Sequence, residues 1–510
     1  MLAIDAGTTG VRTLAVDESG TVVDQAHRPL TQHFPQPGWV EHDPVEVWDL
    51  AVTTLAEVVG RRNAEGTAVA AIGIANQRET AVAWDRRSGR PLRRAIVWQD
   101  RRTAPRCDEL AADGYGPMVR RRTGLVLDPY FSATKFEWLL ARGGVDPSPG
   151  LALGTVDSWL LWQLTVGAAG AGPSRQTGVF ATDTTNASRT MLFDTAELAW
   201  SDELCQLFGI PPHALAEVRP SCGRLGTIGS EVAAVVPGLV GVPVSGLAGD
   251  QQAALFGQAC FEPGLAKVTY GTGSFVLVQA GPARPEPADG LLSTVAWDLG
   301  EHADGRPRVA YAIEGSTFVA GAAIQWLRDE LGVVTRSEDL GPLAESVPDS
   351  GGLFVVPAFA GLGSPWWDAR ARGAITGITA GTGRAQLARA VVEAMAFGVR
   401  DMVDAVTHAG RRPVAELRVE GGASAMDLLL QLQADQLQMP VVRPRCIEST
   451  AVGAAMLAGL GEGVWSSLDE LAGLWRRDLE CRPGAGRDAA DSGYARWLRA
   501  VERSREWVVG

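Results

Sequence analysis

Two short turns rich in glycine and threonine constrain this chain of 510 residues more than any other feature. They are Asp5–Gly10 (DAGTTG) near the start and Tyr270–Ser274 (YGTGS) just past the middle. Each lies between two apolar runs, so each is predicted to form the tip of a β-hairpin. Glycine lets the backbone approach an anion, while threonine hydroxyls and free backbone N–H groups donate to phosphate oxygens. Taken alone, either turn is more typical of an ordinary hairpin, but the pair predicts the two jaws of a phosphate clamp.

Neither turn matches the common nucleotide-binding motifs. No Gly-Lys-Ser/Thr follows, and the next predicted element is a strand rather than a helix, which excludes a Walker A loop and a dinucleotide-binding fingerprint. At roughly 100–200 residues per domain, the length predicts two to four domains. The repeated turn favours two large halves of similar design.

Composition narrows the class of protein further. The net charge of −13 argues against a surface that binds nucleic acid or an anionic membrane. The six cysteines form no Cys-x-x-Cys pair, so neither a zinc site nor a disulfide framework is predicted. No signal peptide precedes the first apolar run and no apolar stretch is long enough to span a bilayer, so we expect a cytoplasmic protein. Of the 46 basic residues only Lys135 and Lys267 are lysines, which fits a composition bias of the source genome.

Local signals predict mixed sheets covered by helices in both halves. The clearest is a helix start with Asp43 as N-cap, Pro44 at the first helical position and Glu46 two residues later. The strands of the first half are expected near 21–26, 69–75 and 81–85, with a helix at about 44–59. In the second half we expect strands near 309–313, 353–357 and 416–419, and helices at about 316–331 and 386–407. The stretch 167–178, rich in glycine, alanine and serine, is predicted to be a flexible surface loop.

Arg78 and Glu79 interrupt two strongly apolar strands. Burying a guanidinium and a carboxylate costs free energy unless the two groups satisfy each other or a polar ligand. Two interpretations therefore stay open. The pair is either a structural ion pair or part of a polyol site, in which arginine donates to one hydroxyl and glutamate accepts from its neighbour. A tryptophan such as Trp98, considered singly, is more often a core residue than a ligand wall.

Asp250 follows the apolar segment 242–249 and opens a short predicted helix. An aspartate in that position is commonly a helix N-cap. The alternative is that it lies at the mouth of a cleft between the halves and accepts a proton from a substrate hydroxyl. Phosphoryl transfer needs a phosphate clamp, Mg²⁺, an oriented nucleophile and such a carboxylate, and this chain has a candidate for each.

Nine colinear segments make the chain resemble the FGGY family of carbohydrate kinases over nearly its whole length. They are 5–9, 37–44, 76–80, 123–131, 154–157, 185–193, 248–257, 270–273 and 321–329. The Arg78-Glu79 segment is most similar to the members that phosphorylate glycerol. The resemblance implies an α/β, two-domain actin/hexokinase-like (ribonuclease H-like) ATPase fold with an interdomain cleft. Residues 1–258 would carry the polyol site and the first phosphate turn, and residues 259–510 the second turn and the nucleotide site.

The resemblance also implies roles for individual residues. Asp250 would be the general base, and Asp5 would orient Mg²⁺ through water. The polyol would be held by Arg78, Glu79, Tyr130, Asp250 and Gln251, with Trp98 and Phe275 along its carbon face. Phosphate contacts would come from Thr8, Thr9, Gly10, Arg12 and Thr272. The rest of the nucleotide would contact Gly321, Gln325, Gly422 and Met426.

Met426 departs from the family pattern, which usually has an asparagine near the adenine. A thioether cannot replace the donor and acceptor of an amide, so base selectivity is left open.

The resemblance implies ATP-dependent phosphorylation of glycerol to sn-glycerol 3-phosphate and ADP, with ATP and Mg²⁺ as cofactors. It also implies a homo-oligomer, either dimer or tetramer. One alternative is a kinase for another short polyol or ketose of the same family, because pocket size cannot be read from a sequence. Another is a non-catalytic ATP-binding member of the superfamily, which would need the phosphate turns but not the polyol residues.

Overall fold

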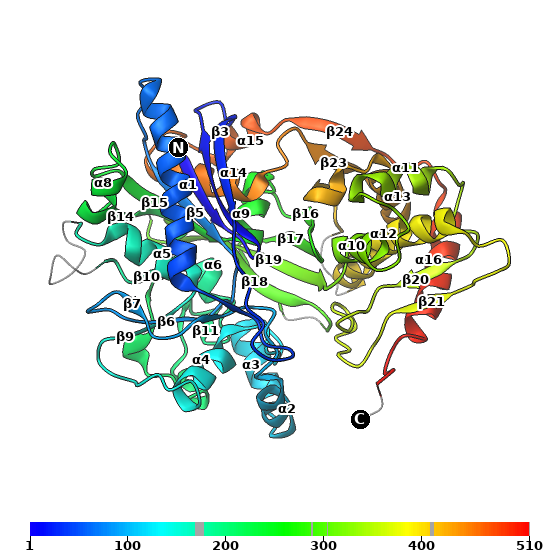
Figure 1. Cartoon of the computed structure of the whole chain (residues 1–510), viewed down its shortest axis with the longest axis horizontal. Helices are drawn as coiled ribbons and strands as arrows, with labels where there is room; N and C mark the ends of the chain where they lie inside the picture. The colour runs from blue at the N-terminus through cyan, green and yellow to red at the C-terminus, as the bar shows by residue number, and fades with distance from the viewer. Residues whose placement is uncertain (169–177, 287–288, 303, 409–412, 509–510) are drawn as a thin grey trace.

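The computed structural model describes residues 1–168, 178–286, 289–302, 304–408 and 413–508. Most of the predicted flexible loop at 167–178 lies outside the described residues. The chain forms two lobes, each built on one large mixed sheet (Figure 1). No helix within the described ranges is long and apolar enough to cross a membrane.

The sheet of the first lobe has six strands in the order β14-β15-β5-β1-β2-β3. β1 (Leu2–Ala6) pairs antiparallel with β2 (Gly10–Val16) and parallel with β5 (Ile72–Asn76). The first predicted hairpin is therefore confirmed. The remaining strands of this sheet are β3 (Val22–Pro29), β14 (Cys222–Thr227) and β15 (Pro243–Gly249).

Helix α1 (Pro44–Ala64) covers this sheet and begins where the sequence predicts. The Asp43 carboxylate caps it by accepting a hydrogen bond from the Val45 N–H at 2.9 Å. The helix runs five residues beyond the predicted end. Its buried residues recur every three or four positions, so one apolar face packs on β2 and β3.

The remaining elements of the first lobe lie in residues 41–235. The strands are β6 (Val82–Asp85), β7 (Arg90–Pro91), β9 (Leu151–Gly154), β10 (Ala181–Asp183), β11 (Phe193–Asp194), β12 (Ala199–Trp200) and β13 (Glu217–Arg219), with β8 (Ala95–Ile96) pairing β4 (Glu41–His42). The helices are α2 (Ala104–Ala112), α3 (Gly116–Thr123), α4 (Ser132–Ala141), α5 (Val156–Thr165), α6 (Thr184–Ala187), α7 (Asp202–Leu207) and α8 (Ser230–Val235).

The second lobe repeats the design of the first. β16 (Leu265–Tyr270) pairs antiparallel with β17 (Ser274–Gly281) and parallel with β22 (Glu416–Glu420). The second predicted hairpin and the predicted repetition are thus confirmed. The seven-stranded sheet has the order β18-β19-β17-β16-β22-β23-β24, completed by β18 (Leu292–Glu301), β19 (Pro307–Thr317), β23 (Val441–Pro444) and β24 (Arg477–Cys481).

The predicted helix at 316–331 is wrong at its start. β19 extends to Thr317, where it pairs with Ser274 of β17, so helix α10 (Gly321–Asp329) begins five residues later. Pairing with a neighbouring strand overrides the local helix signal. The other elements of this lobe are α11 (Leu340–Glu345), β20 (Phe354–Val356), β21 (Ala374–Thr376), α12 (Arg384–His408), α13 (Asp427–Leu437), α15 (Leu468–Leu474) and α16 (Arg487–Glu502).

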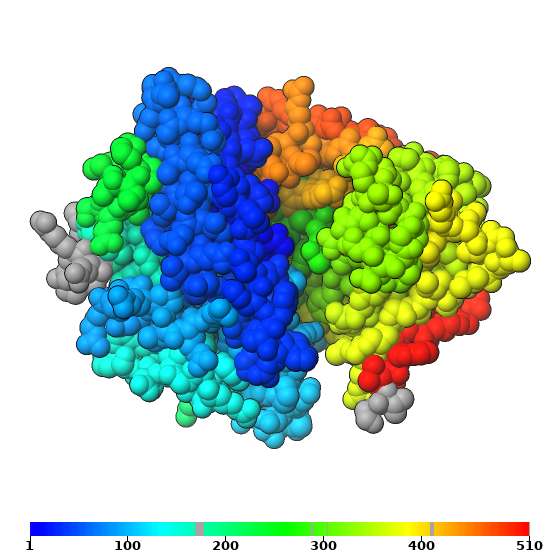
Figure 2. Space-filling model, viewed as in Figure 1, coloured from blue at the N-terminus to red at the C-terminus, as the bar shows by residue number. Residues whose placement is uncertain are grey.

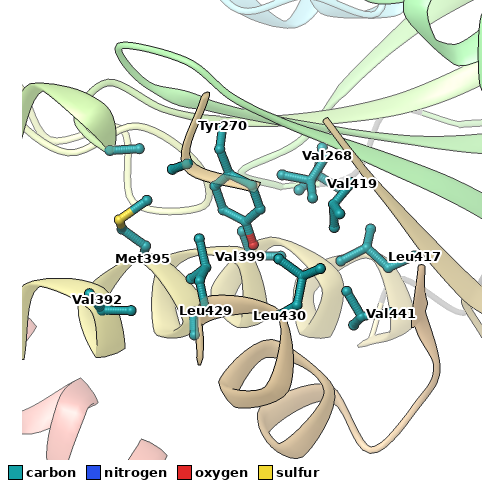
Figure 3. Packing of buried hydrophobic residues seen from close by; sticks show 14 of the residues in the cluster. Val268, Tyr270, Val392, Met395, Val399, Leu417, Val419, Leu429, Leu430 and Val441 are labelled. Atoms are coloured by element: carbon teal, nitrogen blue, oxygen red, sulfur yellow. The ribbon is translucent and has the colours of Figure 1, made fainter. Parts of the chain in front are cut away.

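The core of the second lobe lies between its sheet and helices α12 and α13 (Figure 3). Val268 and Tyr270 of β16 face Leu429 and Leu430 of α13 there. The Tyr270 hydroxyl donates to Gln433 Oε1 at 2.6 Å, so the one polar atom of that ring is satisfied inside the core. This packing holds the strand that leads into the second turn.

Helices α9 (Asp250–Gly257) and α14 (Ser449–Gly461) cross between the lobes in close contact. A Cβ on Gly453 would lie 1.8 Å from the Ala253 carbonyl oxygen, and one on Gly257 would lie 2.1 Å from that of Ser449. Glycine is therefore required on both helices. α14 also packs on β5 and β15, so a late segment of the chain completes the core of the first lobe. The crossing fixes the helix that carries Asp250.

Candidate active site

The two turns line a single cavity of about 240 Å³ between the lobes. Figure 2 shows the groove between the blue segments of the first lobe and the green segments of the second. Every residue that the resemblance assigned to phosphate, metal or polyol lies on its wall: Asp5, Thr8, Thr9, Gly10, Arg12, Arg78, Glu79, Trp98, Tyr130, Asp250, Gln251, Thr272 and Phe275. These residues come from six separate stretches of the sequence, and the fold brings them together.

Asp250 is the first residue of α9, and Gly249 before it is the N-cap. The simple N-cap interpretation of Asp250 is therefore wrong. Its Oδ1 accepts a hydrogen bond from the Gln251 N–H at 2.7 Å and lies 3.3 Å from Arg78 Nε. The side chain is 28% exposed, and it opens to the cavity. A positioned carboxylate of this kind can accept a proton from a bound hydroxyl.

Arg78 and Glu79 belong to a buried network of four charges with Arg189 and Glu314. Arg78 donates to both oxygens of Glu314, at 2.6 and 3.1 Å, and Arg189 joins Glu314 to Glu79 at 2.9 and 2.7 Å. All four residues are at most 2% exposed. Burial alone would raise the pKa of Glu314, but Arg189 and Arg78 hold it below its ordinary value. Two guanidinium groups balance two carboxylates, which makes this burial of charge tolerable.

The two interpretations of Arg78 and Glu79 are thus compatible. The direct Arg78–Glu79 contact is long, with Nε and Oε1 3.7 Å apart, and each residue has a shorter partner in the network. Both residues nevertheless line the cavity. Glu314, from β19 of the second lobe, binds the Arg78 guanidinium of the first lobe, so this ion pair joins the two lobes.

Three aromatic rings form one wall of the cavity. Trp98 lies edge-on to Tyr130 and to Phe275, with ring centroids 5.5 and 6.3 Å apart. The Tyr130 hydroxyl accepts from Arg78 Nη2 at 3.2 Å, and Trp98 Nε1 donates to Thr8 Oγ1 at 2.9 Å. Trp98 is partly exposed, so it is a wall residue that also braces the first turn.

Asp5 lies 3.2 Å from Arg12, measured from Oδ2 to Nε, and Arg12 also pairs with Glu448. Burial raises the pKa of Asp5 to about 7, although Arg12 opposes the shift. In the part of the chain that the structure describes, no group of three or more His, Cys, Asp or Glu side chains is arranged to hold a metal ion. Mg²⁺ commonly uses one or two carboxylates and takes its other oxygens from phosphates and water. Asp5 fits that role.

A second cavity of about 700 Å³ adjoins the first, and Gly271 and Thr272 line both. All four residues predicted to contact the rest of the nucleotide lie on its wall: Gly321, Gln325, Gly422 and Met426. A Cβ on Gly321 would lie 2.6 Å from the Gly271 carbonyl oxygen, so that approach of α10 to the second turn requires glycine. The second turn therefore separates a small polar cavity from a larger one.

The structure adds residues that the sequence reasoning missed. Glu314 and Arg189 hold Arg78 and Glu79, as described above. Lys267 donates to Gln251 Oε1 and to Thr269 Oγ1, and Glu420 accepts from Thr269. For Glu314 and Lys267 the available signal was a charged residue inside an apolar strand, whereas Arg189 lies outside the strands.

Comparison with known proteins agrees with this geometry. Residues 1–257 match the N-terminal domain of the FGGY family of carbohydrate kinases, and residues 266–462 match its C-terminal domain. The chain is 49% identical to a glycerol kinase of Aromatoleum aromaticum, with 100% of this chain and 99% of the relative covered. It is 47% identical to a glycerol kinase of Symbiobacterium thermophilum at the same coverage.

Solved structures show the same fold. The crystal structure of Plasmodium falciparum glycerol kinase with ADP superposes with a TM-score of 0.88 at 32% identity, covering 99% of this chain and 97% of that one. A xylulose kinase from Rhodospirillum rubrum gives 0.82 at 26% identity, covering 98% and 97%. The predicted two-domain α/β fold is confirmed, and the chain belongs to the FGGY family of carbohydrate kinases.

Proposed function

We propose that the protein is a glycerol kinase, which transfers the γ-phosphoryl group of ATP to a terminal hydroxyl of glycerol and forms sn-glycerol 3-phosphate and ADP. One observation carries the proposal: Asp250 opens into the same cavity as both phosphate turns and the whole polyol set. The full-length similarity to proteins named glycerol kinase supports the choice of substrate.

Separate groups of residues would bind glycerol, accept its proton and bind the phosphates. Arg78 and Gln251 would donate to glycerol hydroxyls, Glu79 would accept from one, and the aromatic wall would cover the carbon chain. Asp250 would take the proton of the terminal hydroxyl as its oxygen bonds to the γ-phosphorus and the bond to the ADP oxygen breaks. Thr8, Thr9 and Thr272 would donate to the phosphate oxygens.

Mg²⁺, held through Asp5, would neutralise charge on the β- and γ-phosphates when bound. The nucleoside would occupy the 700 Å³ cavity beside Met426. A thioether offers neither the donor nor the acceptor of an amide, so we expect weak discrimination between ATP and other purine nucleoside triphosphates. We also infer a cytoplasmic homo-oligomer, a dimer or tetramer, whose size light scattering would measure.

The test is a coupled ADP-release assay with glycerol, dihydroxyacetone, xylulose and gluconate. The ratio kcat/KM should be highest for glycerol. Higher turnover on a pentulose would overturn the substrate assignment in favour of another sugar kinase. Calorimetry that detected ATP binding without polyol binding or turnover would favour a non-catalytic member of the superfamily.

A further inference from the structure

The two lysines of this chain are both buried beside the candidate site. All other basic residues are arginines, yet the side chains of Lys135 and Lys267 are fully buried, at 0% exposure. A composition bias would replace lysine with arginine wherever arginine fits. An ammonium is a compact point charge with three tetrahedral donors, whereas a guanidinium is larger and planar, so the two are not interchangeable in a closed pocket. Lysine is thus found where the packing leaves room for an ammonium alone.

Lys135 shows the pattern. It lies in α4, and its Nζ donates to the backbone carbonyl oxygens of Tyr130 and Phe131 at 2.5 and 3.1 Å. Those two carbonyls precede the helix and belong to the segment that presents the Tyr130 ring to the cavity. The ammonium therefore ties down the backbone behind a wall residue.

Lys267 makes a more specific set of contacts. Its Nζ donates to Gln251 Oε1 and to Thr269 Oγ1, the latter at 2.6 Å, and lies 3.4 Å from Glu420 Oε1. Gln251 and Thr269 both line the small cavity. Lys267 belongs to the C-terminal family domain and Gln251 to the N-terminal one, so the contact crosses the floor of the cavity from one domain to the other.

The contact fixes which end of the Gln251 amide faces a ligand. An ammonium can only donate, so the oxygen of the amide must turn toward Lys267. Among the described residues, no hydrogen bond from the Gln251 Nε2 group is found, and the side chain is 7% exposed at the cavity wall. The NH₂ end is then the one left to donate to a hydroxyl oxygen in the cavity.

We propose that Lys267 is a positioning residue, which orients the Gln251 amide as a hydrogen-bond donor to the polyol. The proposal rests on the proposed function and deepens it. Without Lys267 the amide can rotate and present its oxygen, so polyol binding loses one directed donor. The nucleotide cavity does not include Lys267 or Gln251, so ATP binding should keep its strength.

The experiment is a double-mutant cycle on the full chain with Lys267→Met and Gln251→Met. Each single variant should raise the KM for glycerol by about 10-fold to 100-fold, the range for losing one hydrogen bond held by a charged group, with the KM for ATP changed less than about 3-fold. The double variant should be no worse than Gln251→Met alone, because Lys267 acts through Gln251. Lys267→Arg should not restore the wild-type KM for glycerol. Additive effects in the cycle, or an unchanged KM for glycerol, would overturn the proposal.

Arg400→Met is the matched control. It also removes a buried cation, 7% exposed and paired with Asp404 and Asp491, but it lines neither the small cavity nor the nucleotide cavity. It should lower the melting temperature and leave the KM for glycerol unchanged. A glycerol KM that rose equally in this variant would assign the Lys267 effect to lost stability and overturn the proposal.

A measurement on the wild-type protein covers the case in which Lys267→Met does not fold. Selective ¹⁵N-lysine labelling gives two Nζ resonances, because the chain has two lysines. The resonance that Gln251→Met perturbs belongs to Lys267, and it should shift on addition of glycerol. No shift at saturating glycerol would overturn the proposal. If the wild type phosphorylates a different polyol, the substrate assignment fails, and the same tests run with that polyol.

Discussion

The two glycine/threonine turns share a backbone design but differ in chemistry. The first is flanked by charge, with Asp5 before it and Arg12 after it, and Trp98 braces it through Thr8. The second, at Gly271–Gly273, carries no charged side chain and lies between the two cavities, close against Gly321. Under the proposed function, the first turn would bind the metal and the transferred phosphoryl group, and the second turn would bind the rest of the nucleotide.

The largest effect should come from Asp250, which both turns face. Asp250→Asn keeps the size of the side chain but removes the carboxylate proposed to accept the proton, so kcat should fall by about 10²–10⁴-fold. Steady-state ADP release measures this, and calorimetry should show glycerol binding roughly preserved. Near-normal turnover would mean that the proton goes elsewhere and that the turns do not converge on this carboxylate.

Substitutions in the two turns should separate their roles. Asp5→Asn should lower kcat by about 100-fold and raise the Mg²⁺ concentration needed for half-maximal rate, because the carboxylate proposed to orient the ion is lost. Thr272→Val should instead raise the KM for ATP by about 10-fold through one lost phosphate hydrogen bond, with the Mg²⁺ dependence unchanged. Mg²⁺ titrations of both variants at fixed ATP are the measurement. If the rates of the two variants depend on Mg²⁺ in the same way, the assignment of different roles to the two turns is wrong.

A smaller effect should follow from Gly321→Ala. The added Cβ would lie 2.6 Å from the Gly271 carbonyl oxygen, so the second turn must shift while the first stays in place. The KM for ATP should rise about 3- to 10-fold, with little change for glycerol, as expected of a displaced phosphate contact. Gly473→Ala is the matched control, since that helical position has nothing within 4 Å. Equal kinetics in the two variants would contradict the close approach of α10.

The smallest effect on activity at neutral pH should come from His42, which contacts the first turn through Gln77. Buried His42 contacts Gln77 Nε2 through Nδ1 at 3.2 Å, and Gln77 Nε2 donates to the Gly7 carbonyl. Burial lowers the pKa of His42 to about 4, so between pH 6.5 and 4 the unfolded chain binds the proton and the folded chain does not. The contribution of His42 to the free energy of unfolding is therefore complete above pH 6.5 and is lost as the pH falls toward 4.

Urea unfolding at pH 7.5 and 5.0 checks this point. From the shift in the His42 pKa, we expect the free energy of unfolding to fall between pH 7.5 and 5.0 by about 2 kcal/mol more in the wild type than in His42→Gln. The activities of the two proteins at pH 7.5 should be similar. Burial raises the pKa of Asp157 and Asp298 to about 6, which works in the opposite direction, but these contributions cancel in the comparison. Identical losses in both proteins would show that His42 titrates normally.

Local signals predicted the elements that local forces fix. The hairpins, the cap at Asp43 and the strand-to-helix position of Asp250 all depend on neighbours in the sequence. The partner of Arg78 was out of reach, because Glu314 is 236 residues away and no local signal pairs the two residues. The start of α10 was missed for a similar reason, since the pairing of Thr317 with Ser274 is a tertiary contact. The site's lining was predictable through the family resemblance, and its buried supports were not.

The seating of α14 against the first sheet has a consequence for synthesis on the ribosome. Between Gly257, which ends α9, and Ser449, which begins α14, the ribosome adds 191 residues. At about 5–20 residues per second, the apolar face of the first sheet stays exposed for roughly 10–40 seconds before α14 can pack on it. During that interval the nascent polypeptide exposes a surface that a chaperone can recognise, so the first half should aggregate when expressed without residues 449–461.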